Sequence, residues 1–232
     1  MSDRWRDVWC RRKATDEGTL GLRELLDLDG FDSGAGHVDV ADWREYARKV
    51  AGMLGLADGN SIYEVGCGAG AFLYALSEVA AVRVAGCDYS AVLVDSARSA
   101  IPGGNFAVLE AEKLPLEPAY DFVISNGVFH YFRGDAHARA VLERMIAKAR
   151  RAVAVLDVPD LSTRVAAEQA RRESLTPDEY DRKYSGLSHR YYERSWFADV
   201  AALNGMDCRA FRSPIPNYAQ SHYRFGVILS AR

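Results

Sequence analysis

The sequence predicts a single α/β domain built on a mostly parallel sheet. Apolar segments with strand character alternate with helical segments from residue 61 to about residue 156. This alternation is typical of βαβ units with right-handed crossovers. A glycine-rich turn at residues 66–70 joins the first strand to the first helix. The length of 232 residues is enough for one domain with a sizeable core.

Composition excludes several classes of function. The share of hydrophobic residues is 49% and that of charged residues is 26%, which is ordinary for a soluble globular protein. The net charge of −3 gives no overall attraction to nucleic acid or to an anionic membrane. No apolar run approaches the roughly 20 residues that cross a bilayer, and the N-terminus lacks the apolar stretch of a signal peptide. The four cysteines are scattered, as expected of free thiols in a reducing cytoplasm.

The first 57 residues precede the first strand and are expected to form a helical cap. Residues 42–56 have helical spacing, and five apolar side chains fall on one side: Trp43, Tyr46, Ala47, Val50 and Leu54. Trp5 and Trp9 lie four residues apart and would share a helix face.

The segment 63–70 carries the most informative pattern. Glu64 lies in the predicted strand 61–65, and Gly66, Cys67, Gly68 and Gly70 follow before the helix that begins at residue 71. A strand, a glycine turn and a helix can cradle a nucleotide-like ligand, because glycine lets the backbone turn sharply and approach the ligand. The glycine spacing differs from the G-x-G-x-x-G of dinucleotide-binding folds, which disfavours a nicotinamide oxidoreductase. Cys67 suits a small slot in this turn better than a chemical role.

A second predicted strand, 82–88, ends on Asp88, and Tyr89 follows it. Asp88 comes 18 residues after Gly70. An acid at about this separation of 20 residues can accept hydrogen bonds from the two hydroxyls of a ribose. The alternative is a structural role at the start of the helix 91–100, because Asp and Ser are good helix N-caps.

Two further segments complete the pattern. Residues 106–116 contain Glu110, Ala111 and Glu112 ahead of a Leu-Pro pair. Residues 120–132 begin as a buried strand that opens on an acid, and Ser125 and Asn126 lie at its end. The alternative for Glu110 is a solvated loop acid.

These four segments, in this order, resemble the motifs of the class I S-adenosylmethionine (SAM) methyltransferases. The resemblance covers residues 60–158 well and the rest in outline. It implies a seven-stranded, mostly parallel sheet whose antiparallel seventh strand lies beside the fifth. It also implies that Glu110 binds the adenine amine while the Ala111 amide faces the ring. The implied cofactor-binding residues are Glu64, Gly66, Cys67, Gly68, Gly70, Asp88, Tyr89, Glu110, Ala111, Glu112, Ser125 and Asn126.

The remainder of the chain follows this plan with one interruption. A helix at 138–150 and a strand at 152–157 continue the alternation, and a helix at 195–203 and strands at 208–211 and 223–229 end it. Residues 160–190 are polar and too long for an ordinary connection, so they are expected to form a mobile lid that closes on substrate. We therefore divide the domain into a cap (1–57), a SAM-binding core (58–159), a lid insertion (160–194) and a C-terminal helix and strand pair (195–232).

Two histidines are candidates for catalysis. Methyl transfer needs an acceptor aligned with the C–S bond, and a hydroxyl acceptor is helped by a general base. His130 follows the fourth strand, on the edge where open α/β sheets bind ligands, in a segment similar to that in which several small-molecule O-methyltransferases place a catalytic histidine. His189 ends the lid among aromatic residues. The alternatives are a structural role for His130 and lid packing for His189. The expected acceptor-contacting residues are Tyr184, His189, Tyr191, Tyr218 and His222.

The sequence therefore predicts a cytoplasmic, SAM-dependent methyltransferase that acts on a small molecule, at a hydroxyl oxygen, without metal, nucleic acid or membrane. Nitrogen and carboxylate acceptors stay open, as does a macromolecular acceptor, although neither a basic face nor an appended binding domain is evident. A noncatalytic SAM-fold partner protein is the alternative outside the enzymes. A SAM-binding measurement would separate it, and intact cofactor motifs argue against it. The identity of the acceptor and the oligomeric state are left open.

Overall fold

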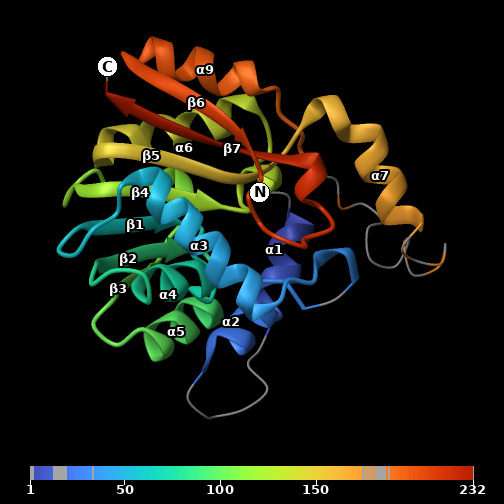
Figure 1. The fold of residues 1–232 in the computed structure, drawn as a ribbon, viewed down its shortest axis with the longest axis horizontal. Helices are drawn as coiled ribbons and strands as arrows, with labels where there is room; N and C mark the ends of the chain where they lie inside the picture. Colours follow the sequence, from blue (N-terminus) through green and yellow to red (C-terminus); the bar gives the residue numbers. More distant parts are fainter. Residues whose placement is uncertain are drawn as a thin grey trace.

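A computed structural model describes residues 3–12, 20–32, 34–173, 176, 178, 180, 187 and 189–231. A seven-stranded sheet with the order β3-β2-β1-β4-β5-β7-β6 forms its central layer (Figure 1). The strands are β1 (Ser61–Val65), β2 (Arg83–Asp88), β3 (Asn105–Val108), β4 (Tyr120–Asn126), β5 (Ala149–Pro159), β6 (Met206–Arg212) and β7 (Arg224–Ala231). Neighbouring strands from β1 to β5 pair in parallel, and β7 runs antiparallel to both β5 and β6. The predicted fold class is confirmed.

Helices cover both faces of the sheet. The described helices are α1 (Asp3–Cys10), α2 (Leu22–Leu28), α3 (Val40–Leu54), α4 (Ala71–Ser77), α5 (Ala91–Ala100), α6 (Asp135–Lys148), α7 (Arg164–Glu173) and α9 (Arg194–Leu203). The buried side chains of α2, α3, α4 and α5 form one apolar cluster with one face of the sheet. Those of α6 and α9 form a second cluster with the other face. Figure 1 shows α7 at the rim, apart from both layers.

The apolar pattern explains why these elements form. All five residues of β1 are buried, with Ile62 in the α3 cluster and Tyr63 in the α6 cluster, as expected of a central strand covered on both faces. The predicted apolar side of α3 is buried against the first cluster. Its Trp43 donates an indole hydrogen bond to the carbonyl of Ala71 at 3.1 Å. This bond ties the N-terminal cap to the first residue of α4.

Several element boundaries differ from the prediction, and those of α6 and β5 are shifted furthest. The helix α6 begins at Asp135 and ends at Lys148, earlier at both ends than the predicted range 138–150. The strand β5 begins at Ala149, three residues before its predicted start at 152, because its pairing with β4 extends to Tyr120. Arg150 and Arg151 are exposed in this part of the strand. Charged residues are not typical of a buried strand, so the sequence did not predict that β5 includes them. The pairing with β4 there is made by backbone groups and does not require apolar side chains.

The chain returns to the sheet after α7 along the carboxyl end of β5. The Tyr192 amide donates to the carbonyl of Pro159 at 3.0 Å, and the Tyr192 hydroxyl donates to the carbonyl of Phe129 at 2.8 Å. The Arg190 amide donates to the carbonyl of His130 at 2.9 Å. Residues 190–192 are therefore fixed beside the loop that follows β4. No helix in the described ranges is long and apolar enough to cross a membrane.

Candidate active site

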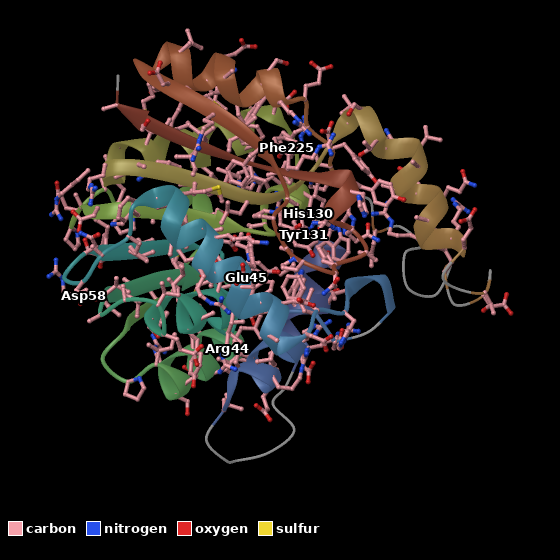
Figure 2. The ribbon with its side chains drawn as sticks, in the orientation of Figure 1. Arg44, Glu45, Asp58, His130, Tyr131 and Phe225 are labelled. Carbon is pink, nitrogen blue, oxygen red and sulfur yellow. The ribbon has the colours of Figure 1, made fainter. Side chains whose placement is uncertain are left out.

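A cavity of about 270 Å³ lies at the carboxyl edge of the sheet. Parallel strands bring their carboxyl ends together at this edge, which is where open α/β sheets bind ligands. The N-terminal cap, the glycine turn, the loops after β2 and β4, and the start of β7 all contribute to the lining. In Figure 2, His130 and Tyr131 lie near the loop that leads into β7.

The cavity brings together most of the residues singled out in the sequence. Twelve of them line it: Glu64, Gly66, Cys67, Gly68, Asp88, Tyr89, Glu110, Ala111, Asn126, His130, His189 and Tyr218. Their elements are far apart in the sequence, so the fold gathers the cofactor candidates and both candidate bases around one space.

Three of the expected cofactor residues lie outside this lining. Gly70 is the N-cap of α4, and a Cβ there would come within 3.2 Å of the Ala97 side chain, so it packs α4 against α5. Ser125 is buried and its hydroxyl donates to the carbonyl of Val65 at 2.9 Å. Glu112 is exposed and lies 3.4 Å from His137.

Some of the residues expected to contact the acceptor do not line this cavity. Tyr191 borders an adjoining hollow, where its hydroxyl accepts a hydrogen bond from Arg171 at 2.6 Å. His222 is exposed in the short turn Ser221–Tyr223 that precedes β7, and it does not line the cavity. Tyr184 lies outside the described residues.

The carboxyl of Asp29, at the end of α2, binds backbone amides of the glycine turn and of the start of α4. Its Oδ1 accepts from the Ala69 amide at 2.6 Å and its Oδ2 accepts from the Ala71 amide at 3.1 Å. A Cβ at position 68 would come within 2.2 Å of the Asp29 Oδ1, and Gly68 has φ of +52°, which other residues adopt with strain. Gly68 is thus required both by its close contact with Asp29 of the N-terminal cap and by the backbone conformation of the turn. No pattern in the sequence pointed to Asp29, since its partners lie 40 and 42 residues away.

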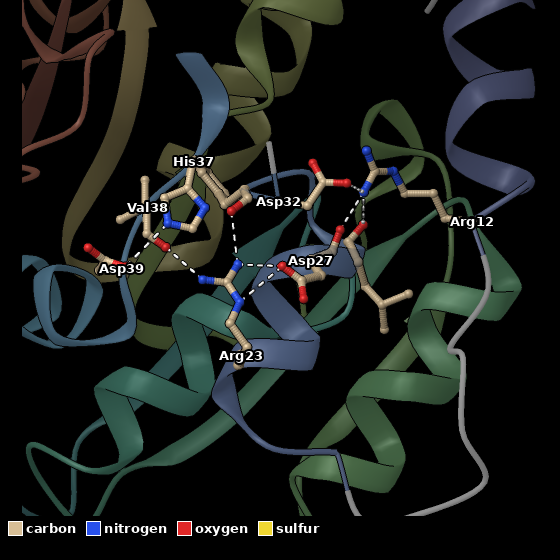
Figure 3. A network of polar contacts seen from close by, with 9 residues as sticks. Arg12, Arg23, Asp27, Asp32, His37, Val38 and Asp39 are labelled. Atoms are coloured by element: carbon tan, nitrogen blue, oxygen red, sulfur yellow. Dashed lines mark hydrogen bonds and ion pairs between the residues drawn. The ribbon is translucent and has the colours of Figure 1, made fainter. Parts of the chain in front are cut away.

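A polar network holds the segment that carries Asp29 (Figure 3). Arg23 donates to the Asp27 carboxylate at 3.0 Å and to the carbonyl of Val38 at 2.8 Å. Arg12 donates to the backbone carbonyl of Asp27. These bonds join the ends of α1 and α2 to the loop before α3 and fix the position of the Asp29 carboxyl.

Three carboxyl groups crowd this end of the cavity. Burial raises the pKa of Asp29 from 3.8 to about 7, although its side chain keeps some contact with the cavity, and amide hydrogen bonds only partly offset this rise. Burial also raises the pKa of Asp88 to about 6, against the amides of Ser90 and Gly68. Glu64 is 2% exposed, and burial, with Asp29 and Asp88 nearby, raises its pKa. Its Oε2 has no hydrogen-bond partner among the described residues.

This arrangement favours a cation. Asp88 raises the pKa of Asp29, and both raise the pKa of Glu64, so bringing a positive group among them lowers these pKa values and ionises the carboxyls. The unpartnered oxygen of Glu64 is positioned to accept a hydrogen bond from a ligand.

The other end of the cavity is aromatic and holds both candidate bases. The rings of His130 and His189 lie 4.7 Å apart between centroids, and Trp5 stacks on His189 at 5.1 Å. Tyr131 lies 4.7 Å from Trp5. Burial, then the charges of His189, Arg224 and Arg171, keep the pKa of His130 well below its ordinary value. Burial and the same two arginines lower the pKa of His189. Both imidazoles are therefore neutral near pH 7.

The two imidazoles differ in their hydrogen bonds. Arg171 lies 3.3 Å from the Nδ1 of His189. Because a guanidinium only donates, this nitrogen accepts, and the hydrogen of the neutral ring is assigned to Nε2. The Nδ1 of His130, by contrast, has no partner among the described residues.

A buried ion pair borders the same cavity. Arg224 donates to the Oδ2 of Asp157 at 2.7 Å and to its carbonyl at 3.0 Å. Asp157 has φ of +55°, at the point where the pairing of β5 with β7 shifts between Val155 and Val158. Such a backbone costs on the order of 1–3 kcal/mol in a residue other than glycine. Burial raises the pKa of Asp157 even though Arg224 opposes this.

The helix α1 closes the cavity at Glu110. Arg6 forms an ion pair with Glu110, and its guanidinium lies over the ring of Tyr89 at 5.4 Å. The cap therefore contacts both ends of the cavity, through Arg6 at one end and Trp5 at the other.

The raised pKa of Asp29 predicts a pH-dependent stability. Between pH 3.8 and about 7 the folded protein retains a proton that the unfolded chain releases, so the free energy of unfolding falls as pH rises through this window. We expect Asp29→Asn, which does not titrate, to show a shallower decline between pH 5 and 7 in urea titrations. Asp199→Asn, an exposed change on α9, should follow the wild type. Parallel curves for wild type and Asp29→Asn would show that Asp29 has an ordinary pKa.

Comparison with known proteins agrees with this geometry. Residues 63–156 match a family described as a methyltransferase domain. No curated protein matches the chain. Among solved structures, magnesium protoporphyrin IX methyltransferase from Synechocystis PCC 6803, with bound S-adenosylhomocysteine (SAH), has a TM-score of 0.61 at 17% identity, over 99% of this chain and 94% of that one.

Two further structures share the fold. The plantazolicin methyltransferase BpumL, in complex with SAH, has a TM-score of 0.66 at 14% identity, over 99% of this chain and 98% of that one. CalS10 from Micromonospora echinaspora, an amino pentose methyltransferase, has a TM-score of 0.61 at 14% identity, over 82% of this chain and 92% of that one. Residues 63–156 thus match a methyltransferase domain, and the chain shares the fold of these SAM- and SAH-binding methyltransferases.

Proposed function

We propose that this enzyme transfers the methyl group of SAM to a hydroxyl oxygen of a small-molecule acceptor. One observation carries the proposal: a single cavity has a cluster of carboxyls at one end and neutral imidazoles at the other. Structural neighbours hold SAM or SAH, and the substrates in their names are magnesium protoporphyrin IX, plantazolicin and an amino pentose. An acceptor of small-molecule size suits a cavity of about 270 Å³.

The carboxyl end fits the cofactor. SAM carries a sulfonium, an ammonium and a ribose with two hydroxyls, and these groups match carboxylates as ligands. Asp88 ends β2 and its two oxygens keep lone pairs beyond their bonds to the amides of Ser90 and Gly68. The free Oε2 of Glu64 would accept from an ammonium group or a hydroxyl.

The residues of the chain have separate tasks in the reaction. When bound, SAM supplies an electrophilic methyl group on its sulfonium. Trp5 and Trp9 of α1 cover the cavity and exclude water. His130 would take the proton of the acceptor hydroxyl at Nδ1, because this lone pair is free, and the oxygen would gain the methyl group as its bond to the sulfonium breaks and SAH leaves. His189 positions the acceptor instead, since its Nδ1 already accepts from Arg171.

An amine acceptor is the second candidate, because a neutral His130 could equally take a proton from an ammonium group. The two guanidiniums of Arg171 and Arg224 near the imidazoles favour the uncharged hydroxyl. Incubation with methyl-labelled SAM and matched hydroxyl, amine and carboxylate compounds would distinguish them. Labelling of amines or carboxylates alone would contradict the proposal.

The proposed cofactor site is tested at Asp88. Asp88→Ala removes hydrogen bonds to a charged acceptor and should weaken SAM binding by about 1.5–3 kcal/mol, measured by titration calorimetry. Asp95→Ala, an exposed change on α5, should leave the affinity unaltered. Equal affinities of Asp88→Ala and the wild type would remove Asp88 from the cofactor site.

The proposed general base is tested at His130. His130→Ala should lower turnover by ~10²–10⁴-fold, with SAM affinity unchanged, because general base catalysis contributes about this much. His37→Ala, an exposed control, should retain full turnover. Since the pKa of His130 is lowered, wild-type turnover should not depend on its protonation near pH 7. Turnover of His130→Ala within threefold of the wild type would assign His130 a structural role.

A further inference from the structure

Asp157 is a buried carboxylate that the fold holds in an unfavourable backbone conformation. Its φ is +55°, its side chain is 4% exposed, and it lines the same cavity as the candidate bases. Strained residues of this kind cluster at ligand-binding sites, where surrounding contacts enforce the conformation. No step of the reaction described above uses Asp157.

The two oxygens of this carboxylate have different surroundings. Arg224 occupies Oδ2 and also donates to the Asp157 carbonyl, so side chain and backbone are fixed together. Oδ1 is buried and has no hydrogen-bond partner among the described residues. A buried acceptor without a partner is rare, and a ligand that donates a hydrogen bond would satisfy it.

The neighbourhood indicates what kind of donor would fit. Arg224 and Arg171 both border the cavity and lower the pKa of His130 and His189, so two positive charges act at this end. They disfavour an ammonium group and leave a neutral hydroxyl as the donor. The aromatic wall of the cavity consists of Trp5, Trp9 and Tyr131, with ring centroids 4.7 and 5.7 Å from Tyr131. Such a wall suits an aromatic ring, which packs edge to face against it.

We propose that Asp157 is an acceptor-binding residue: its Oδ1 accepts a hydrogen bond from a second hydroxyl of an aromatic acceptor, while His130 faces the hydroxyl that is methylated. Arg224 is the positioning residue that holds the carboxylate. The acceptor is then an aromatic compound with at least two hydroxyl groups. This inference rests on the proposed hydroxyl methylation at the same cavity.

The variant Asp157→Asn tests the role of Oδ1 with little change of shape. Arg224 only donates, so the amide oxygen of Asn would stay with Arg224, and the amide NH₂ would take the place of Oδ1. The substitution therefore turns the free acceptor into a donor. Asn also tolerates a positive φ better than most residues.

The experiment compares phenol with catechol, resorcinol and hydroquinone, by ligand-observed NMR titration of the SAH-saturated protein. For the wild type, at least one of the three diols should bind about tenfold more tightly than phenol, as expected for a hydrogen bond to a charged acceptor. Asp157→Asn should abolish this advantage while SAH affinity stays within twofold. Asp199→Asn, an exposed change on α9, should keep it.

The outcomes separate this inference from the proposed function. A wild-type protein that does not bind SAH contradicts the proposed function itself. SAH binding without tighter binding of any diol, or with an equal advantage in Asp157→Asn, overturns the role of Asp157 alone. If Asp157→Asn fails to bind SAH because it does not fold, Arg224→Lys provides the second test. Lys replaces the planar guanidinium that bonds to the Asp157 Oδ2 and carbonyl with a shorter, more flexible side chain, so the carboxylate is held less firmly and the diol advantage should fall severalfold; an unchanged advantage would contradict the proposal.

Discussion

The crowding of carboxyl groups beneath the glycine turn is the constraint on which the site depends. Glu64 in β1, Asp88 at the end of β2 and Asp29 at the end of α2 come together where water is scarce. Burial favours the protonated form of each, and the neighbouring acids reinforce this for Glu64. A fold built for stability alone would place apolar groups here. The carboxyl cluster suits the binding of a positively charged ligand, and SAM is such a ligand.

Asp29 also joins the N-terminal cap to the carboxyl edge of the sheet. Asp29 bonds to the amides at the start of α4, and Trp43 bonds to the carbonyl of Ala71 in the same turn. The cap thereby supplies Asp29 at the carboxyl end of the cavity and Trp5 at the imidazole end. The N-terminal cap therefore contributes to both ends of the cavity.

The sequence predicted the parts of this design that local patterns encode. Strand β1, helix α5 and the glycine turn follow from apolar runs, glycine spacing and helix caps, and the acids at 64 and 88 follow from their places in these motifs. Asp29, Asp157 and Arg224 could not be predicted in this way. Arg224 meets Asp157 across 67 residues of sequence, and no pattern marks either residue before the antiparallel pairing of β5 and β7 brings them together. The early start of β5 was missed because its first arginines are exposed.

The most direct test of the carboxyl cluster measures protons during SAM binding. Calorimetric titration of the protein with SAM at pH 6.5, in two buffers with different ionisation enthalpies, reports how many protons leave the complex. Because the pKa values of Asp29 and Asp88 are about 7 and about 6 in the free protein, a cation placed among them should lower both and release protons at pH 6.5. We expect net proton release that disappears above pH 8. Equal heats in the two buffers, or no binding of SAM, would contradict a carboxyl cluster that receives the cofactor.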